Sequence, residues 1–147
     1  SGASCAHSGY FNTGDKAVTG IANEAGTSVV FETQETIYIS GTYDSANEKV
    51  VIAYQTQLSG NYGRVVVGTV SGNSISFGSV VTFSNRDTTH ISTTYDPDSG
   101  KVVIAYGDVS SQGGRVIVGT VSGTSISFGS KFVFNNGLTP LTIKRST

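Results

Sequence analysis

Two polar segments, residues 55–63 and 107–114, carry side chains suited to holding a sugar. A tyrosine ring can pack against the face of a sugar ring, while amide and carboxylate groups can bond to its hydroxyls. Both segments join two predicted strands, and loops carry recognition more often than strands do. The four candidate binding residues are Asn61, Tyr62, Asp108 and Gln112.

An arginine follows each polar segment, and these residues, Arg64 and Arg115, are further candidates for ligand binding. A guanidinium can clamp the carboxylate of an acidic sugar through two parallel hydrogen bonds. It can equally form an ion pair within the protein, for which Asp44 and Asp96 are available acids. The ion pair is the simpler expectation, and both uses stay open at this point.

A catalytic triad is not indicated by the sequence. It would require a serine, a histidine and a carboxylate close together, and the chain has two histidines, His7 and His90. The Gly-x-Ser-x-Gly pattern of a nucleophile elbow is absent from the sequence. The sequence contains a repeated unit, described below, in which His90 occupies the position that Tyr38 has in the preceding copy. This equivalence favours an ordinary strand residue over a catalytic one. We therefore predict no enzymatic activity and no catalytic residues.

Asp44 and Asp96 recur at equivalent positions, and paired carboxylates are the machinery of glycoside hydrolysis. An acid and a base need different environments to acquire different pKa values, which two copies of one position do not provide. Each aspartate is better explained as the end of a strand, bonding to backbone amides of the following turn. Residues 96–100 have the outline of a calcium loop but lack its later glutamate. We predict no metal and no cofactor.

The composition is that of a β-rich domain. Nineteen of the 147 residues are glycine, two are proline and 13% are charged, which suits short strands joined by tight turns. The net charge of −1, with scattered basic residues, argues against nucleic acid as a partner. No apolar run approaches the roughly 20 residues of a membrane-spanning helix, so no membrane span is expected. The chain lacks methionine and begins at Ser1, which indicates a processed or excised piece.

An internal repeat dominates the sequence. Residues 42–54 and 64–79 return with few changes as residues 94–106 and 115–130. This period of about 52 residues indicates tandem copies of one structural unit.

One domain is expected, because 147 residues are enough for one hydrophobic core and too few for two. Within it we distinguish two complete units and a fainter partial copy that precedes them. The predicted ranges are 16–35 for the partial unit, 36–84 and 88–135 for the complete units, and 136–147 for a C-terminal tail.

Each unit contains four candidate strands whose apolar patterns differ. The second strand, at 50–54 and 102–106, is apolar throughout, as expected of a strand covered on both faces. The first and the fourth alternate polar with apolar residues and are expected to be half exposed. Such a sheet fits a blade of a β-propeller, stacked between neighbouring blades. We predict an all-β fold of four-stranded antiparallel blades; a β-sandwich of two repeats and a β-solenoid are the alternatives.

Two complete blades and part of a third do not close a propeller ring, which has roughly four to eight blades. The open blade faces would leave apolar surface in water. We expect several copies to associate, with a trimer favoured, or else the chain to be a fragment of a longer repeat protein. The N-terminal partial unit can supply strands to the incomplete blade of another copy.

The repeat resembles those of tail-fibre and other surface proteins of environmental, especially marine, bacteriophages. The resemblance is carried by Tyr95–Tyr106 and Val118–Ser130, and it covers about residues 36 to 135. It implies a module on a virion or cell surface, extracellular in location, that contacts a host glycan or receptor. We therefore predict a non-catalytic recognition module. A purely structural virion or assembly protein and a fragment of a propeller glycosidase are the alternatives.

Overall fold

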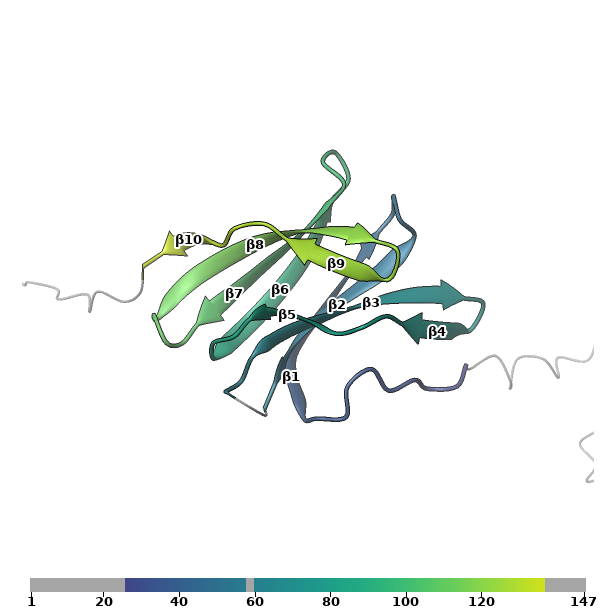
Figure 1. Cartoon of the computed structure of the whole chain (residues 1–147), viewed down its shortest axis with the longest axis horizontal. Coiled ribbons are helices and arrows are strands. Elements are labelled where there is room, and N and C mark those ends of the chain that lie inside the picture. Colours follow the sequence, from purple (N-terminus) through teal and green to yellow (C-terminus); the bar gives the residue numbers. More distant parts are fainter. Residues whose placement is uncertain (1–25, 58–59, 137–147) are drawn as a thin grey trace, which may run out of the picture.

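The computed structural model describes residues 26–57 and 60–136, which form two antiparallel β-sheets and no helix (Figure 1). The predicted all-β class is confirmed. Of the predicted partial unit and tail, the parts at 16–25 and 137–147 lie outside the described residues. Sheet A contains β1 (Thr36–Asp44), β2 (Lys49–Thr56), β3 (Gly63–Ser71), β4 (Ser74–Phe77) and β5 (Val81–Ser84). Sheet B contains β6 (Thr88–Asp96), β7 (Lys101–Asp108), β8 (Gly113–Ser122), β9 (Ser125–Phe128) and β10 (Phe132–Asn135).

Both sheets have the same topology. In sheet A, β1, β2 and β3 are neighbours and both β4 and β5 pair with β3; in sheet B, β6, β7 and β8 are neighbours and both β9 and β10 pair with β8. The predicted fourth strand is therefore two short strands that pair with successive parts of one neighbour. The break falls at Gly78 and Gly129, whose amides donate to the carbonyls of Val67 and Val118 at 2.9 and 3.0 Å. The alternation of apolar residues stops at these glycines, so the chain leaves the ladder and rejoins it further along.

The hairpins between first and second strands are closed by aspartates, as the sequence predicts. Asp44 accepts hydrogen bonds from the amides of Ala46 and Asn47 at 3.1 and 3.0 Å, and Asp96 accepts one from the Ser99 hydroxyl. Burial by itself would raise the pKa of Asp44, but hydrogen bonds from the side chain and backbone of Asn47 outweigh it and lower the pKa. The two carboxylates are thus occupied by their own turns.

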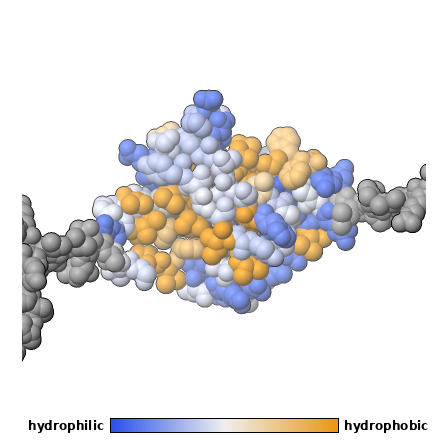
Figure 2. All heavy atoms as spheres, turned by 180° about the vertical axis from the view of Figure 1, so that it is seen from behind, coloured by the Kyte–Doolittle hydropathy of each residue, from blue (hydrophilic) through white to orange (hydrophobic). Residues whose placement is uncertain are grey.

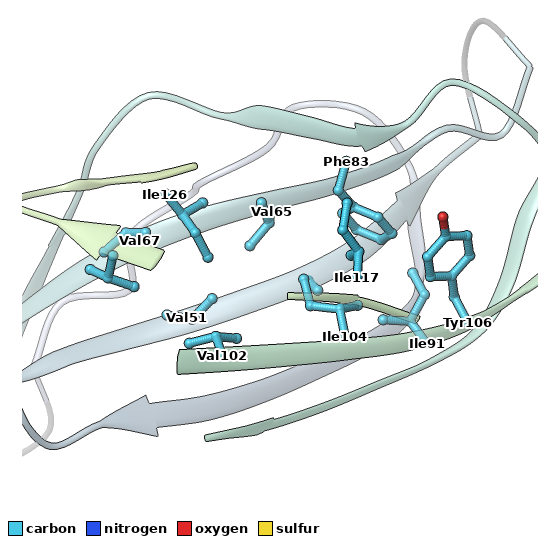
Figure 3. Packing of buried hydrophobic residues seen from close by; sticks show 12 residues of the cluster. Val51, Val65, Val67, Phe83, Ile91, Val102, Ile104, Tyr106, Ile117 and Ile126 are labelled. Carbon is cyan, nitrogen blue, oxygen red and sulfur yellow. The ribbon is translucent and has the colours of Figure 1, made fainter. Parts of the chain in front are cut away.

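The hydrophobic core lies between the two sheets, where their side chains point toward one another (Figure 3). The strands that line it are rich in valine and isoleucine, which pack well on a pleated surface. Burying each such side chain contributes about 1.5–3 kcal/mol. The core residues are Val51, Ala53, Val65, Val67 and Phe83 from sheet A, and Ile91, Val102, Ile104, Tyr106, Ile117, Val121 and Ile126 from sheet B.

The two sheets do not pack with equivalent faces together. One face of sheet A packs on the opposite face of sheet B, an arrangement that we call same-sense stacking. Val51 and Ile104 both lie in the core, yet their repeat equivalents, Val103 and Ile52, lie on the opposite faces of their sheets. A two-fold sandwich would instead bury the same face of both units. We call the two faces leading and trailing, and the leading face of sheet A packs on the trailing face of sheet B. The leading face carries Val51, Ala53, Val65 and Val67 in sheet A and Val103, Ala105, Val116 and Val118 in sheet B, and the trailing face carries Ile52, Tyr54 and Val66 in sheet A and Ile104, Tyr106 and Ile117 in sheet B.

The segment Gly26–Glu32 covers part of the trailing face of sheet A in the way that β5 covers that of sheet B. The ring centroid of Phe31 lies 5.1 and 5.5 Å from those of a tyrosine and a phenylalanine of sheet A. The Phe83 centroid lies 5.2 and 6.2 Å from the equivalent rings of sheet B. The equivalent pairs are Phe31 and Phe83, Tyr54 and Tyr106, and Phe77 and Phe128. This segment therefore takes the place that a preceding unit's last strand would occupy.

Candidate functional site

The residues predicted to bind a ligand all lie at one end of the two sheets, which we call the loop end. It contains the connections from β2 to β3 and from β7 to β8, together with the start of β6. The Thr88 amide donates to the Asn61 carbonyl at 3.0 Å, and the Gln55 side-chain amide donates to Asp87 at 3.1 Å. Since Thr88 also pairs with Asp108 in the ladder, these contacts join the two connections. The six predicted residues are Asn61, Tyr62, Arg64, Asp108, Gln112 and Arg115.

Asn61, Tyr62 and Gln112 keep surface from which they can reach a ligand. Gln112 is exposed, while Asn61 and Tyr62 are half-buried. Asn61 and Gln112 hold equivalent places in their connections and share a left-handed backbone, with φ values of 58° and 50°. The Tyr62 carbonyl accepts a hydrogen bond from the Thr56 amide at 3.0 Å, and the Tyr62 ring lies beside Gly60. These bonds fix the backbone from which the side chains project.

Arg64 forms an ion pair within the protein, but its partner is neither of the predicted aspartates. Its Nη1 atom lies 3.1 Å from Oε2 of Glu32, and the Tyr54 hydroxyl donates to the same oxygen at 3.2 Å. Burial would raise the pKa of Glu32, but hydrogen bonds from a backbone amide and from Arg64 outweigh it and lower the pKa. Burial beside this carboxylate raises the pKa of Tyr54. Arg64 is therefore already neutralised, which leaves little of its charge for an acidic sugar.

Asp108 is buried in an ion pair. Its Oδ2 atom lies 2.6 Å from Nε of Arg115 and 3.9 Å from Nε of Arg86, and its Oδ1 atom accepts the Ser111 amide at 3.3 Å. The Arg115 contact has the separation of a close ion pair without the alignment of a hydrogen bond. Burial would raise the pKa of Asp108, but the hydrogen bonds from Ser111 and the charge of Arg115 outweigh it, so the pKa is lowered. The carboxylate holds the arginine in place and has no surface of its own to offer a ligand.

The two units supply the counter-charge for the repeated arginine from different places. In the first unit it comes from Glu32, and the equivalent position in the second unit is Ser84. There the carboxylate comes instead from Asp108, whose equivalent in the first unit is Thr56. Neither acid belongs to the motifs that repeat, whereas the aspartates of the turns recur in both units.

Tyr38 and His90 also belong to the loop end, although sequence reasoning did not assign them to a site. Their rings stack with centroids 5.1 Å apart and an interplanar angle of 30°. Each lies on a bulge, because the register of β1 against β2 shifts between Ile37 and Ser40, and that of β6 against β7 shifts at the equivalent place. Tyr38 is 40% exposed and His90 is exposed. The two rings form a platform that is open to solvent.

The backbone under this platform is strained. Tyr38 and His90 have φ values of 52° and 49°, a left-handed conformation that costs a side-chain-bearing residue roughly 1–2 kcal/mol. Strain of this kind persists where the surrounding structure holds it, and it clusters at ligand sites. A signal for the site was present in the sequence: an aromatic or imidazole ring recurs at one position, two residues before a repeated serine.

The strain can be measured by substitution at Tyr38. Tyr38→Gly is expected to be more stable than Tyr38→Ala by about 1 kcal/mol, because both variants lose the ring and only glycine adopts a left-handed backbone without penalty. Urea denaturation of the two variants measures the difference. Equal stability, or a more stable alanine variant, would show that the bulge is not strained as described.

Metal ligation and membrane spanning find no support in the part of the chain that the structure describes. Within residues 26–57 and 60–136, no group of three or more His, Cys, Asp and Glu side chains is placed to hold a metal ion. The same residues include no helix of the length and apolarity needed to cross a membrane.

No protein-family model matches the chain, and neither a curated protein nor a solved structure matches it.

Proposed function

We propose that the protein is a non-catalytic recognition module that binds a glycan or a host receptor on a virion or cell surface, outside the cell. The observation that carries this proposal is the stacked pair Tyr38 and His90, held on strained backbone at equivalent bulges and exposed to solvent. A protein retains such strain where the positions of the side chains matter. An exposed ring platform with polar neighbours is a surface that suits a sugar.

The loop end also offers hydrogen-bonding groups for sugar hydroxyls. Gln112 is exposed and Asn61 is half-buried at the same loop end, and amide side chains can both donate and accept. The two arginines predicted to bind a ligand are already paired, because Arg64 forms an ion pair with Glu32 and Arg115 forms one with Asp108. A neutral sugar is therefore a better match for this end than an acidic one.

The proposed scaffold is a β-propeller in which sheets A and B are successive blades and several copies of the chain complete the ring. Same-sense stacking supports this arrangement, because blades of a ring pack leading face on trailing face. Three chains with two blades each would make a six-bladed ring, in which the platform recurs in every chain. Repetition of a weak site around one particle raises its avidity.

A glycan array tests the recognition proposal. The chain is expected to be retained on a subset of neutral glycans, and Tyr38→Ala or His90→Ala is expected to weaken retention roughly tenfold through loss of one stacked ring. The matched control is Tyr38→Phe, which keeps the ring and should keep the retention. Unchanged retention by both alanine variants would contradict the site.

A purely structural virion or assembly role is the second candidate, because apolar side chains are exposed on both outer faces of the stacked sheets. It differs from recognition in one measurable respect. A structural element would form a defined oligomer and show no retention of the unmodified chain on glycan or receptor arrays.

A further inference from the structure

The leading face of sheet B repeats the leading face of sheet A but has no sheet packed on it. In sheet A this face is buried, with Val65 and Val67 at 0% and 1% exposure. Their equivalents Val116 and Val118 are only half-buried. The contrast is largest at the last strand, where Phe83 is 3% exposed and its equivalent Phe134 is 67% exposed.

The trailing face of sheet A shows the complementary deficit. Ile39 and Val70 are 56% and 54% exposed, whereas their equivalents in sheet B, Ile91 and Val121, are 8% and 5% exposed because sheet A covers them. Figure 2 shows apolar side chains reaching the surface on the side opposite to that of Figure 1. The chain therefore carries, at its two outer faces, the two halves of a contact that it already makes once internally.

The internal contact shows which positions would meet. The Ser40 hydroxyl lies 2.9 Å from the Thr93 hydroxyl and accepts the Thr93 amide at 3.0 Å. One repeat later, Ser92 on the leading face of sheet B is the equivalent of Ser40, and Gly41 on the trailing face of sheet A is the equivalent of Thr93.

We propose that the leading face of sheet B docks on the trailing face of sheet A of a second copy of this chain, head to tail. The occupant is a second copy because each outer face repeats, with few changes, one side of the buried contact between sheets A and B. This proposal rests on the proposed self-association and names the surface that makes it. A head-to-tail contact of this kind closes into a ring when the rotation between copies allows it.

The segment Gly26–Glu32 stays in place when the second copy docks, and β10 of the docking copy gives way to it. Both segments would occupy the same position in the docked pair, because Phe31 and Phe134 are equivalent residues of the repeat. Only Gly26–Glu32 carries the acid that neutralises Arg64, through Glu32; the equivalent residue of β10 is Asn135. Gly26–Glu32 would thus pair with β8 of the docking copy, a strand exchange between chains.

Disulfide crosslinking tests the docking in the full chain with Cys5→Ser as background. Ser92→Cys combined with Gly41→Cys is expected to give crosslinked products of two or more chains on mild oxidation. The two positions of one chain lie on opposite outer faces with both sheets between them, so a disulfide within one chain is excluded by distance. The control is Ser40→Cys with Thr93→Cys, which reproduces the internal contact and should give a crosslinked monomer.

Two further variants separate the outcomes. Val103→Arg, on the leading face of sheet B, is expected to abolish the crosslink between chains and to leave the internal control crosslink unchanged. Phe134→Ala is expected to leave the crosslink between chains intact. Loss of this crosslink in Phe134→Ala but not in Phe31→Ala would overturn the strand exchange. No crosslink between chains, with the internal control formed, would overturn the docking itself. Glycan retention that persists in such a chain would leave the recognition proposal standing.

Discussion

Phe83→Ala is expected to lower the free energy of unfolding by about 3–5 kcal/mol, the range for deleting a buried phenylalanine side chain. Phe83 is 3% exposed and its ring packs against the Tyr106 and Phe128 rings of sheet B. It also covers Gly63, where an added Cβ would lie 2.6 Å from the ring. The substitution therefore opens a cavity between the two sheets as well as over one strand.

Phe134→Ala is the matched control for this experiment. Phe134 holds the equivalent position in sheet B and covers Gly114 in the same way, but it is 67% exposed. Its removal is expected to change the free energy of unfolding by no more than about 0.5 kcal/mol in the isolated chain. Urea denaturation of both variants at low protein concentration decides the matter. Similar losses in the two variants would contradict the stacking of sheet A's leading face on sheet B.

Asp108→Asn is expected to lower the free energy of unfolding by about 2 kcal/mol. Breaking a fully buried ion pair costs about 3–5 kcal/mol, and the expected loss is smaller because the Arg115 side chain is 20% exposed and water screens its charge. Arg86, at 3.9 Å and 53% exposed, adds little. Asp98→Asn changes an exposed carboxylate and is expected to shift stability by at most about 0.5 kcal/mol.

The pH dependence of the same variant provides an independent check. The pKa of Asp108 is lowered in the folded protein from the ordinary value of 3.8. The stability that it contributes is therefore present above that value and is lost as the pH falls through the folded pKa. Asp108→Asn should lose less stability than the unmodified protein between about pH 5 and pH 2. An unchanged acid limb of the stability curve would show that Asp108 is not paired in the folded state.

The strands and their order could be predicted because the repeat and the apolar patterns specify them. Residues 50–54 and 102–106 are apolar at every position and form the middle strands β2 and β7. Within the chain β2 is largely buried on both faces, whereas β7 is buried on its trailing face and half-buried on its leading face. The division of the fourth strand escaped prediction, because Gly78 and Gly129 read equally well as small residues within one strand. Pairing with a neighbour, which is a tertiary property, decides between the two.

The candidate site was predicted less well than the fold. The sequence predicts Asn61 and Gln112 as candidates because they lie where the two repeats differ, and such positions lie in loops. The structure places both in connections between strands. The burial of Asp108 could not be predicted from the repeat. The second unit has Ser84 where the first unit has Glu32, the acid that pairs with Arg64, so Asp108 pairs with Arg115 instead. The sequence pattern predicts ordinary strand residues at Tyr38 and His90, because a bulge leaves no fixed mark in a side-chain pattern.

Same-sense stacking of two equivalent sheets leaves one complementary face open at each end, and we expect these faces to dock between copies of the chain. The solution mass of the chain, measured by light scattering after size exclusion over a range of concentrations, tests this docking most directly. We expect a particle of several chains, with three times the chain mass of 15.2 kDa favoured. A folded monomer at every concentration would contradict the docking of one copy on another and leave the outer faces without a partner of their own kind.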